Sequence, residues 1–94
     1  MNLYHVHCGY YDSEVANGVY EFHVSYFVPA SDSKEARLKA KEIPEYKAKR
    51  MHVYGLQEIY QIDGSRLELL KTDQPGSVIK NILHRDIAPK NPNI

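Results

Sequence analysis

The sequence predicts an α+β fold with element order ββαββ: a four-stranded antiparallel sheet with one helix on one face, followed by a short C-terminal helical tail. Two alternating segments, a capped segment with helical spacing and one Asp-Gly turn support this prediction. With 94 residues the chain is long enough for one small domain. We assign the ββαββ domain to residues 1–70 and the tail, with its possible short helix, to residues 71–94.

Two segments of the N-terminal third alternate between apolar and polar residues, as half-buried strands do. They are residues 3–10 and 19–28, and residues 11–18 between them are rich in turn formers. The even-numbered residues of both segments should form the core face: Tyr4, Val6, Cys8, Tyr10, Tyr20, Phe22, Val24, Tyr26 and Val28. A loop centred near Ser13 or Glu14 would place His23 or Glu21 opposite His7.

A helix should begin after the second strand, which Pro29 is expected to stop. Asp32 and Glu35 have capping-box spacing. Ala36, Ala40 and Ile43 then form a narrow apolar stripe, and Pro44 ends the pattern.

A second hairpin is predicted at Asp63-Gly64, with strands at residues 52–62 and 65–70 and a bulge near Gly55. In the tail, Pro75-Gly76 marks a turn, and Pro89 and Pro92 close the chain. The spacing of four aliphatic residues between these points predicts a short amphipathic helix: Val78, Ile79, Ile82 and Leu83.

One helix on a four-stranded sheet leaves the other sheet face uncovered. A core this thin supplies no more than about 3–5 kcal/mol of stability. A second copy that covers this face or pairs with an edge strand would remove both problems. The sequence therefore predicts a homodimer.

The chain has one cysteine and no sign of export or membrane insertion. Cys8 has no intramolecular partner, the N-terminus lacks the features of a signal peptide, and no apolar run approaches 18 residues. We predict a cytoplasmic protein without membrane association. Cys8 falls on the apolar face, where a buried thiol is favoured over a nucleophile. The sequence contains no Gly-rich phosphate loop, CxxC pair or GxSxG elbow, and so no catalytic residue is assigned.

Histidines gather on the side of the first hairpin that faces away from the core. His5 and His7 lie on one strand, Glu21 and His23 on the next, and His52 could join them if its strand is adjacent. His5, His7 and His23 suit a divalent cation such as Zn²⁺. The favoured interpretation is a polar surface that faces solvent or a second copy. His84, in the tail, is the least relevant histidine.

Twelve basic and twelve acidic residues balance, but they are unevenly distributed. Residues 1–33 contain four acidic residues and no Lys or Arg, whereas residues 34–50 contain seven basic and three acidic residues. The basic segment and the eight tyrosines raise nucleic-acid binding as an alternative, but a pI near 7.0 and the core positions of several tyrosines argue against it. Self-complementarity between the two segments is the favoured interpretation.

The order of several short motifs resembles a bacterial family, the domain of unknown function 1543. The motifs are Leu3-Tyr4-His5-Val6 with Cys8-Gly9-Tyr10, Tyr20-Glu21-Phe22-His23, Phe27-Val28-Pro29-Ala30-Ser31, Glu35-Ala36 with Lys39-Ala40-Lys41, His52, and Ile62-Asp63-Gly64 before Leu67. The match covers about residues 3–70. Three positions depart from the family pattern: Cys8 replaces the first Gly of Gly-Gly, Phe22 the Leu of Glu-Leu-His, and Tyr54 the Asp of His-x-Asp.

Longer members of this family look like two such units in one chain, so the resemblance implies that two copies of this shorter chain associate. It also points to Glu21, His23 and His52 as the ligand-binding residues, ahead of His5 and His7. It supplies no activity. Our leading prediction is a non-enzymatic homodimeric binding or interaction module. The alternative is a metal- or small-ligand-binding protein with a His/Glu site on the sheet.

Overall fold

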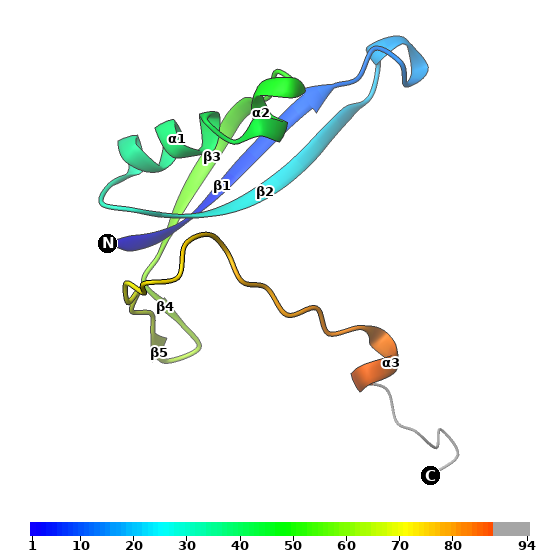
Figure 1. Ribbon diagram of the computed structural model, residues 1–94. Helices are drawn as coiled ribbons and strands as arrows, with labels where there is room; N and C mark the ends of the chain where they lie inside the picture. The colour runs from blue at the N-terminus through cyan, green and yellow to red at the C-terminus, as the bar shows by residue number, and fades with distance from the viewer. Residues whose placement is uncertain (88–94) are drawn as a thin grey trace.

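The computed structural model describes residues 1–87, and its centre is a three-stranded antiparallel sheet in the order β2-β1-β3 (Figure 1). The strands are β1 (Asn2–Tyr11), β2 (Glu21–Ala30) and β3 (His52–Ile59). Helix α1 (Ser33–Lys41) packs against all three strands, and the shorter α2 (Pro44–Ala48) follows it on the same side of the sheet. The α+β class and the position of the helix are confirmed.

The predicted four-stranded sheet is wrong, because the second hairpin does not join the main sheet. Tyr60 separates β3 from β4 (Gln61–Ile62), which pairs only with β5 (Ser65–Arg66). The predicted turn itself is confirmed: Asp63 and Gly64 have φ values of 47° and 76°, which a tight type I′ hairpin requires. With only two residues in β5, the hairpin lacks the strand length that a fourth place in the sheet needs.

The core lies between α1 and the even-numbered face of the first hairpin, as the alternation predicts. Its buried residues are Tyr4, Val6, Cys8, Val28, Ala30, Ala36, Ala40, Tyr46 and Met51. Tyr10, Val24 and Tyr26 pack against them partly buried. Two predicted core residues are exceptions. Tyr20 lies before β2 begins and is exposed, and Phe22, near the start of β2, is exposed as well.

The pairing register of β1 and β2 differs from the predicted one. His7 lies opposite Ser25, and His23 lies opposite Gly9. The reason is the loop, which includes a 3₁₀ turn (Ala16–Gly18) whose Ala16 and Asn17 have φ values of 47° and 57°. This turn lengthens the connection, so β2 begins at Glu21 rather than at residue 19. The strand also continues through Pro29, which an edge strand tolerates because one of its sides makes no ladder hydrogen bonds.

Helix α1 begins where the capping pattern predicts. The Asp32 side chain accepts a hydrogen bond from the backbone N–H of Glu35 at 2.7 Å. Ala36 and Ala40 face the sheet and are buried, so the helix lies close to the large side chains of β1 and β2. Pro44 follows the end of α1 and also begins α2, which the sequence analysis did not predict.

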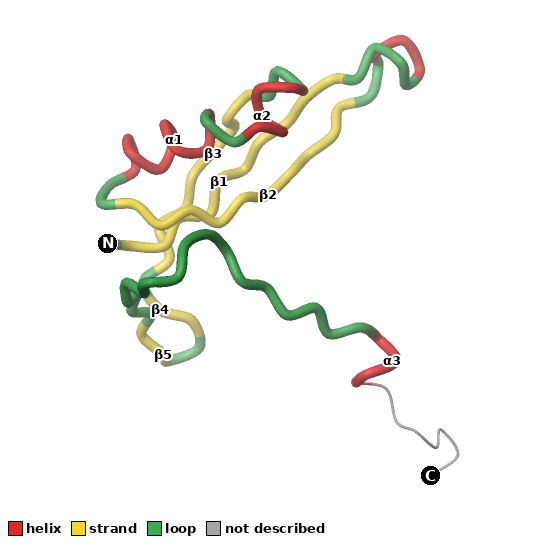
Figure 2. Tube along the Cα trace, viewed as in Figure 1, coloured by secondary structure: helices red, strands yellow, loops and turns green. Residues whose placement is uncertain are grey.

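The chain beyond Arg66 leaves the folded part of the molecule (Figure 2). It runs as an extended segment away from the sheet to α3 (His84–Ile87). The predicted helix over residues 78–83 is therefore absent, and helical structure begins only at His84. Pro89 and Pro92 lie outside the described residues. Within residues 1–87 no helix is both long enough and apolar enough to cross a lipid bilayer.

Candidate functional site

The sheet face opposite α1, which we call the open face, carries the odd-numbered side chains of β1 and β2. His5, His7, Glu21 and His23 all belong to it, as predicted from the alternation. No element within residues 1–87 makes an extended packing contact with this face. The polar cluster thus lies on an accessible surface.

Glu21, His23 and His7 form a continuous chain of hydrogen bonds across β2 and β1. Glu21 Oε1 is 2.6 Å from His23 Nε2, and His23 Nδ1 is 2.7 Å from His7 Nε2. In neutral His23 the carboxylate holds the proton on Nε2, so Nδ1 accepts the hydrogen bond that His7 Nε2 donates. The observed register makes this possible, because His23 reaches His7 diagonally across the strand pair.

A tyrosine from β3 completes this cluster. The Tyr54 hydroxyl donates to Glu21 Oε2 at 2.8 Å, and its ring centroid lies 5.7 Å from that of His23 and 6.0 Å from that of His7. In the sequence, Tyr54 stands out only as a departure from a family pattern. The signal for its role was the bulge predicted near Gly55: pairing of β1 with β3 shifts between His7 and Cys8, and Tyr54 is the extra residue.

The glycine at position 9 makes room for the Tyr54 ring. A Cβ atom added to Gly9 would collide with Tyr54 Cε2. Gly9 is paired with His23 on one side and His52 on the other, so a side chain at this position would occupy the centre of the cluster.

These contacts shift the pKa values of the cluster in opposite directions. Hydrogen bonds from Tyr54 and then Tyr11 lower the pKa of the Glu21 carboxyl. Glu21 in turn raises the pKa of Tyr54 to about 12, first through the hydrogen bond, and raises the pKa of Tyr11. Near neutral pH, Glu21 is therefore an ionised acceptor and Tyr54 a neutral donor.

His5 lies on the same face but belongs to a separate group. Its ring nitrogens pair with Gln57 Oε1 at 2.9 Å and with Ser25 Oγ at 2.8 Å, and its ring lies 5.5 Å from that of Phe27. A shallow hollow of about 250 Å³ separates the two groups, lined by His5, His7, Gly55, Leu56 and Gln57. Of the three predicted metal ligands, only His7 and His23 are in direct contact.

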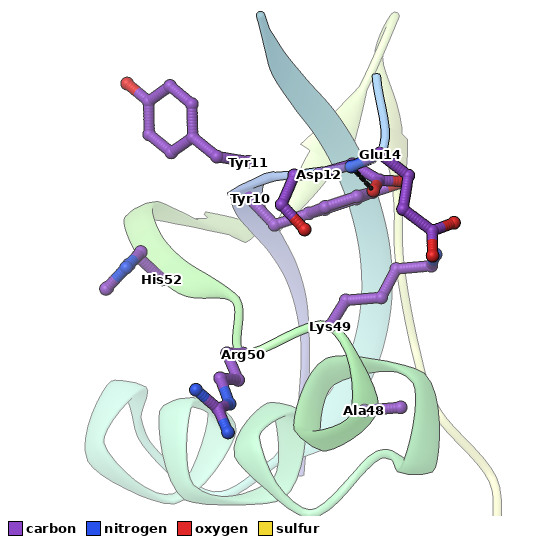
Figure 3. Close-up of a pocket in the computed structure, with 9 residues that line it drawn as sticks. Tyr10, Tyr11, Asp12, Glu14, Ala48, Lys49, Arg50 and His52 are labelled. Carbon is purple, nitrogen blue, oxygen red and sulfur yellow. Dashed lines mark hydrogen bonds between the residues drawn. The ribbon is translucent and has the colours of Figure 1, made fainter. Parts of the chain in front are cut away.

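His52 does not converge with Glu21 and His23. β3 pairs with β1 rather than with β2, so His52 and His23 lie on opposite sides of Gly9. The His52 ring is 6.5 Å from that of Tyr54, and it lines a different, larger hollow of about 550 Å³ at the end of the sheet (Figure 3). His84 lies in α3, in the tail.

The larger hollow lies between an acidic and a basic segment. Asp12 and Glu14, from the loop after β1, line it together with Lys49 and Arg50, from the connection between α2 and β3. Lys49 extends towards Glu14, whereas the Arg50 side chain points away from both carboxylates (Figure 3). Lys49 Nζ also lies 5.0 Å from the centre of the Tyr10 ring, within cation–π range. The opposite charges offset one another, so the hollow does not present a field of one sign to a charged ligand.

Cys8 is buried at the centre of the sheet, and burial raises the pKa of its thiol. Both properties suit a packing residue. Within residues 1–87, no group of three or more His, Cys, Asp or Glu side chains is arranged to hold a metal ion.

Comparisons with known proteins identify no relative of this chain. No family model, curated protein or solved structure matches the chain.

Proposed function

We propose that this protein is a non-enzymatic homodimeric interaction module, in which each copy covers apolar surface of the other. The amount of exposed surface supports this proposal. The chain exposes 8128 Å², whereas a compact protein of 10.9 kDa exposes about 5,600 Å². The radius of gyration is 17.4 Å, compared with about 12 Å for a compact domain of this length.

The excess surface is of the size that obligate dimers bury. It amounts to about 2,500 Å² per chain, and obligate homodimer interfaces bury about 1,000–2,500 Å² from each partner. Large hydrophobic side chains contribute to it. On the open face Phe27 is 66% exposed, and the residues after β5 include a series of exposed aliphatic side chains. A stable monomer rarely shows apolar surface on this scale.

Mass measurement in solution tests the proposal. Light scattering coupled to gel filtration should give twice the 10.9 kDa chain mass at micromolar concentration. Phe27→Asp should lower this mass, because it places a charge on the open face. Leu38→Asp is the matched control, since Leu38 is 56% exposed on α1 and faces away from the open face. A monomer mass for the unmodified chain contradicts the proposal.

A second candidate function is divalent-cation binding at His7 and His23. It is favoured by the carboxylate behind His23, since metal-ligating histidines usually donate their other nitrogen to such a group. Two nitrogens on one tetrahedral Zn²⁺ lie about 3.3 Å apart, so the 2.7 Å pair would need to open only slightly. Water or a further ligand would fill the remaining positions.

Calorimetric titration with Zn²⁺ tests this second candidate. Binding heat should be present in the native protein, absent in His23→Ala and unchanged in the control His84→Ala. Glu21→Gln should weaken binding by about 10–100-fold, because it removes the carboxylate that orients His23. Absence of heat in the native protein would rule the candidate out.

Two further assignments stay predictions: the resemblance to the bacterial family, the domain of unknown function 1543, and a cytoplasmic location. Nucleic acid is not proposed as a partner. The acidic loop faces the basic segment within the same chain, which reduces the free positive field. No binding to a random single-stranded oligonucleotide is expected at about 50 mM salt.

A further inference from the structure

We infer that residues 67–87 of one copy cover the open face of the second copy, so that the two chains exchange their C-terminal segments. We call residues 67–87 the C-terminal segment. The inference rests on the proposed dimer and specifies which surfaces meet in it.

The C-terminal segment contains eight aliphatic residues that have no packing in its own chain. Its aliphatic side chains are all exposed, Ile79 by 79%: Leu67, Leu69, Leu70, Val78, Ile79, Ile82, Leu83 and Ile87. Within the described chain, no backbone–backbone hydrogen bond joins residues 68–82 to another element. Ordering such a segment costs conformational entropy that only burial elsewhere can offset.

The spacing of the aliphatic residues fits a helix that forms on a surface. Val78, Ile79, Ile82, Leu83 and Ile87 would share one side of a helix, with Asp86 among them in its last turn, while Lys80, Asn81 and Arg85 would occupy the other side. A helix of ten residues is too short to be stable alone in water, where about 12–15 are needed. α3 already covers its last four residues, His84–Ile87, and can extend once the apolar side is buried.

Within residues 1–87, the open face is a surface that lacks a cover and matches this segment in length. β1 and β2 have ten residues each and so extend about 33 Å. Residues 67–77, if extended, reach about the same distance. The face presents Phe27 beside His5 and Ser25, and its charged residue Glu21 lies at one end, held by Tyr54.

The direction of the chain favours a second copy over the segment's own sheet. After β5 the chain first turns back towards the end of the sheet and then runs away from it to α3, without crossing the face (Figure 1). A two-fold arrangement then buries both segments and both open faces at once, as exchanged elements do in swapped dimers. In this arrangement the Glu21–His23–His7 cluster is closed off by the partner.

Cross-linking between single-cysteine variants tests the exchange. Cys8 is buried, so an added cysteine is the accessible thiol of each variant. Ser25→Cys, on the open face, is mixed with Ile79→Cys or Ile82→Cys and treated with a short bismaleimide. We expect cross-linked heterodimers from these mixtures and none from Lys34→Cys, an exposed position on α1, mixed with the same tail variants.

The results of cross-linking and light scattering distinguish failure of the segment exchange from failure of the proposed dimer. If light scattering shows a dimer but neither tail variant links to Ser25→Cys, the exchange is wrong and the proposed function stands. Linking within one chain of a Ser25→Cys/Ile82→Cys double variant, with none between chains, also overturns the exchange. A monomer mass overturns the proposed function.

A second measurement uses substitutions in the C-terminal segment. Ile79→Asp/Ile82→Asp should weaken dimerisation by at least about 100-fold, because burial of each aliphatic side chain contributes at least tenfold. Asn81→Asp adds the same charged side chain between them without removing an apolar one, and should change the dissociation constant by less than about threefold. Equal effects of the two would contradict the exchange.

Discussion

At the scale of single residues, the open face is organised around a missing side chain. Gly9 lies in the central strand between His23 and His52, and the Tyr54 ring fills the space above it. This ring separates His52 from His23 and at the same time holds Glu21. The sequence could place the histidines on one face, but the occupation of position 9 by a tyrosine from a bulge depends on tertiary structure.

Gly9→Ala should destabilise the protein by about 1–3 kcal/mol, because the added methyl group collides with the Tyr54 ring and approaches the backbone oxygen of Phe22 at 3.2 Å. Gly55→Ala is the matched control on the same face, where an added Cβ meets nothing within 4 Å. It should leave stability unchanged or raise it slightly. Urea unfolding of both variants measures this, and equal losses would show that position 9 is not crowded.

Tyr54→Phe should lower the melting temperature in a pH-dependent way. Because the pKa of Glu21 is lowered in the folded state, the ionised carboxylate contributes to the free energy of unfolding above about pH 4.5, and this contribution is lost as the pH falls. Because the pKa of Tyr54 is raised in the folded state, the neutral phenol contributes to the free energy of unfolding below about pH 10, and this contribution is lost as the pH rises towards 12. The difference from the native protein should thus be flat at pH 6–9 and shrink at both ends. Tyr20→Phe, at an exposed phenol outside the cluster, should show no such profile.

At the scale of elements, local signals predicted the helix and the first two strands well. Alternation placed Val6, Cys8 and Val28 in the core, and the capping box placed the start of α1. Strand order and register could not be predicted, because they depend on the loop conformation at Ala16 and on the pairing of β3 with β1. For the same reason the predicted convergence of His52 with Glu21 did not occur.

Asp32→Ala should cost about 1 kcal/mol of stability, because it removes the acceptor for the Glu35 backbone N–H at the start of α1. Asp32→Asn retains an acceptor oxygen and should stay within a few tenths of a kcal/mol of the native protein. Chemical denaturation of the two variants provides the measurement. A full loss in Asp32→Asn would mean that charge rather than capping matters here.

At the scale of the whole molecule, the charge balance has a partly intramolecular explanation. The acidic loop with Asp12 and Glu14 lines one hollow with Lys49 and Arg50 of its own chain, and Lys49 extends towards Glu14 (Figure 3). These segments of opposite charge therefore lie on the same hollow of one chain. The C-terminal segment contains three acidic and three basic residues and has no net charge to steer association.

Dimerisation should therefore depend little on salt. We expect the dissociation constant to change by less than about threefold between 50 and 500 mM NaCl, since screening acts on exposed charges and not on apolar contacts. Sedimentation at both concentrations measures it. A steep loss of affinity at high salt would instead place the charged segments at the interface.

Because Cys8 is buried, the rate at which its thiol is modified can report how often the core of the native protein opens. The thiol lies beneath α1 on the central strand, and burial raises its pKa, so a thiol reagent can modify it only after the sheet and helix separate. The rate of modification then reports how often the core opens, without any added label. Comparison of this rate at low and high protein concentration would show how much a second copy slows that opening.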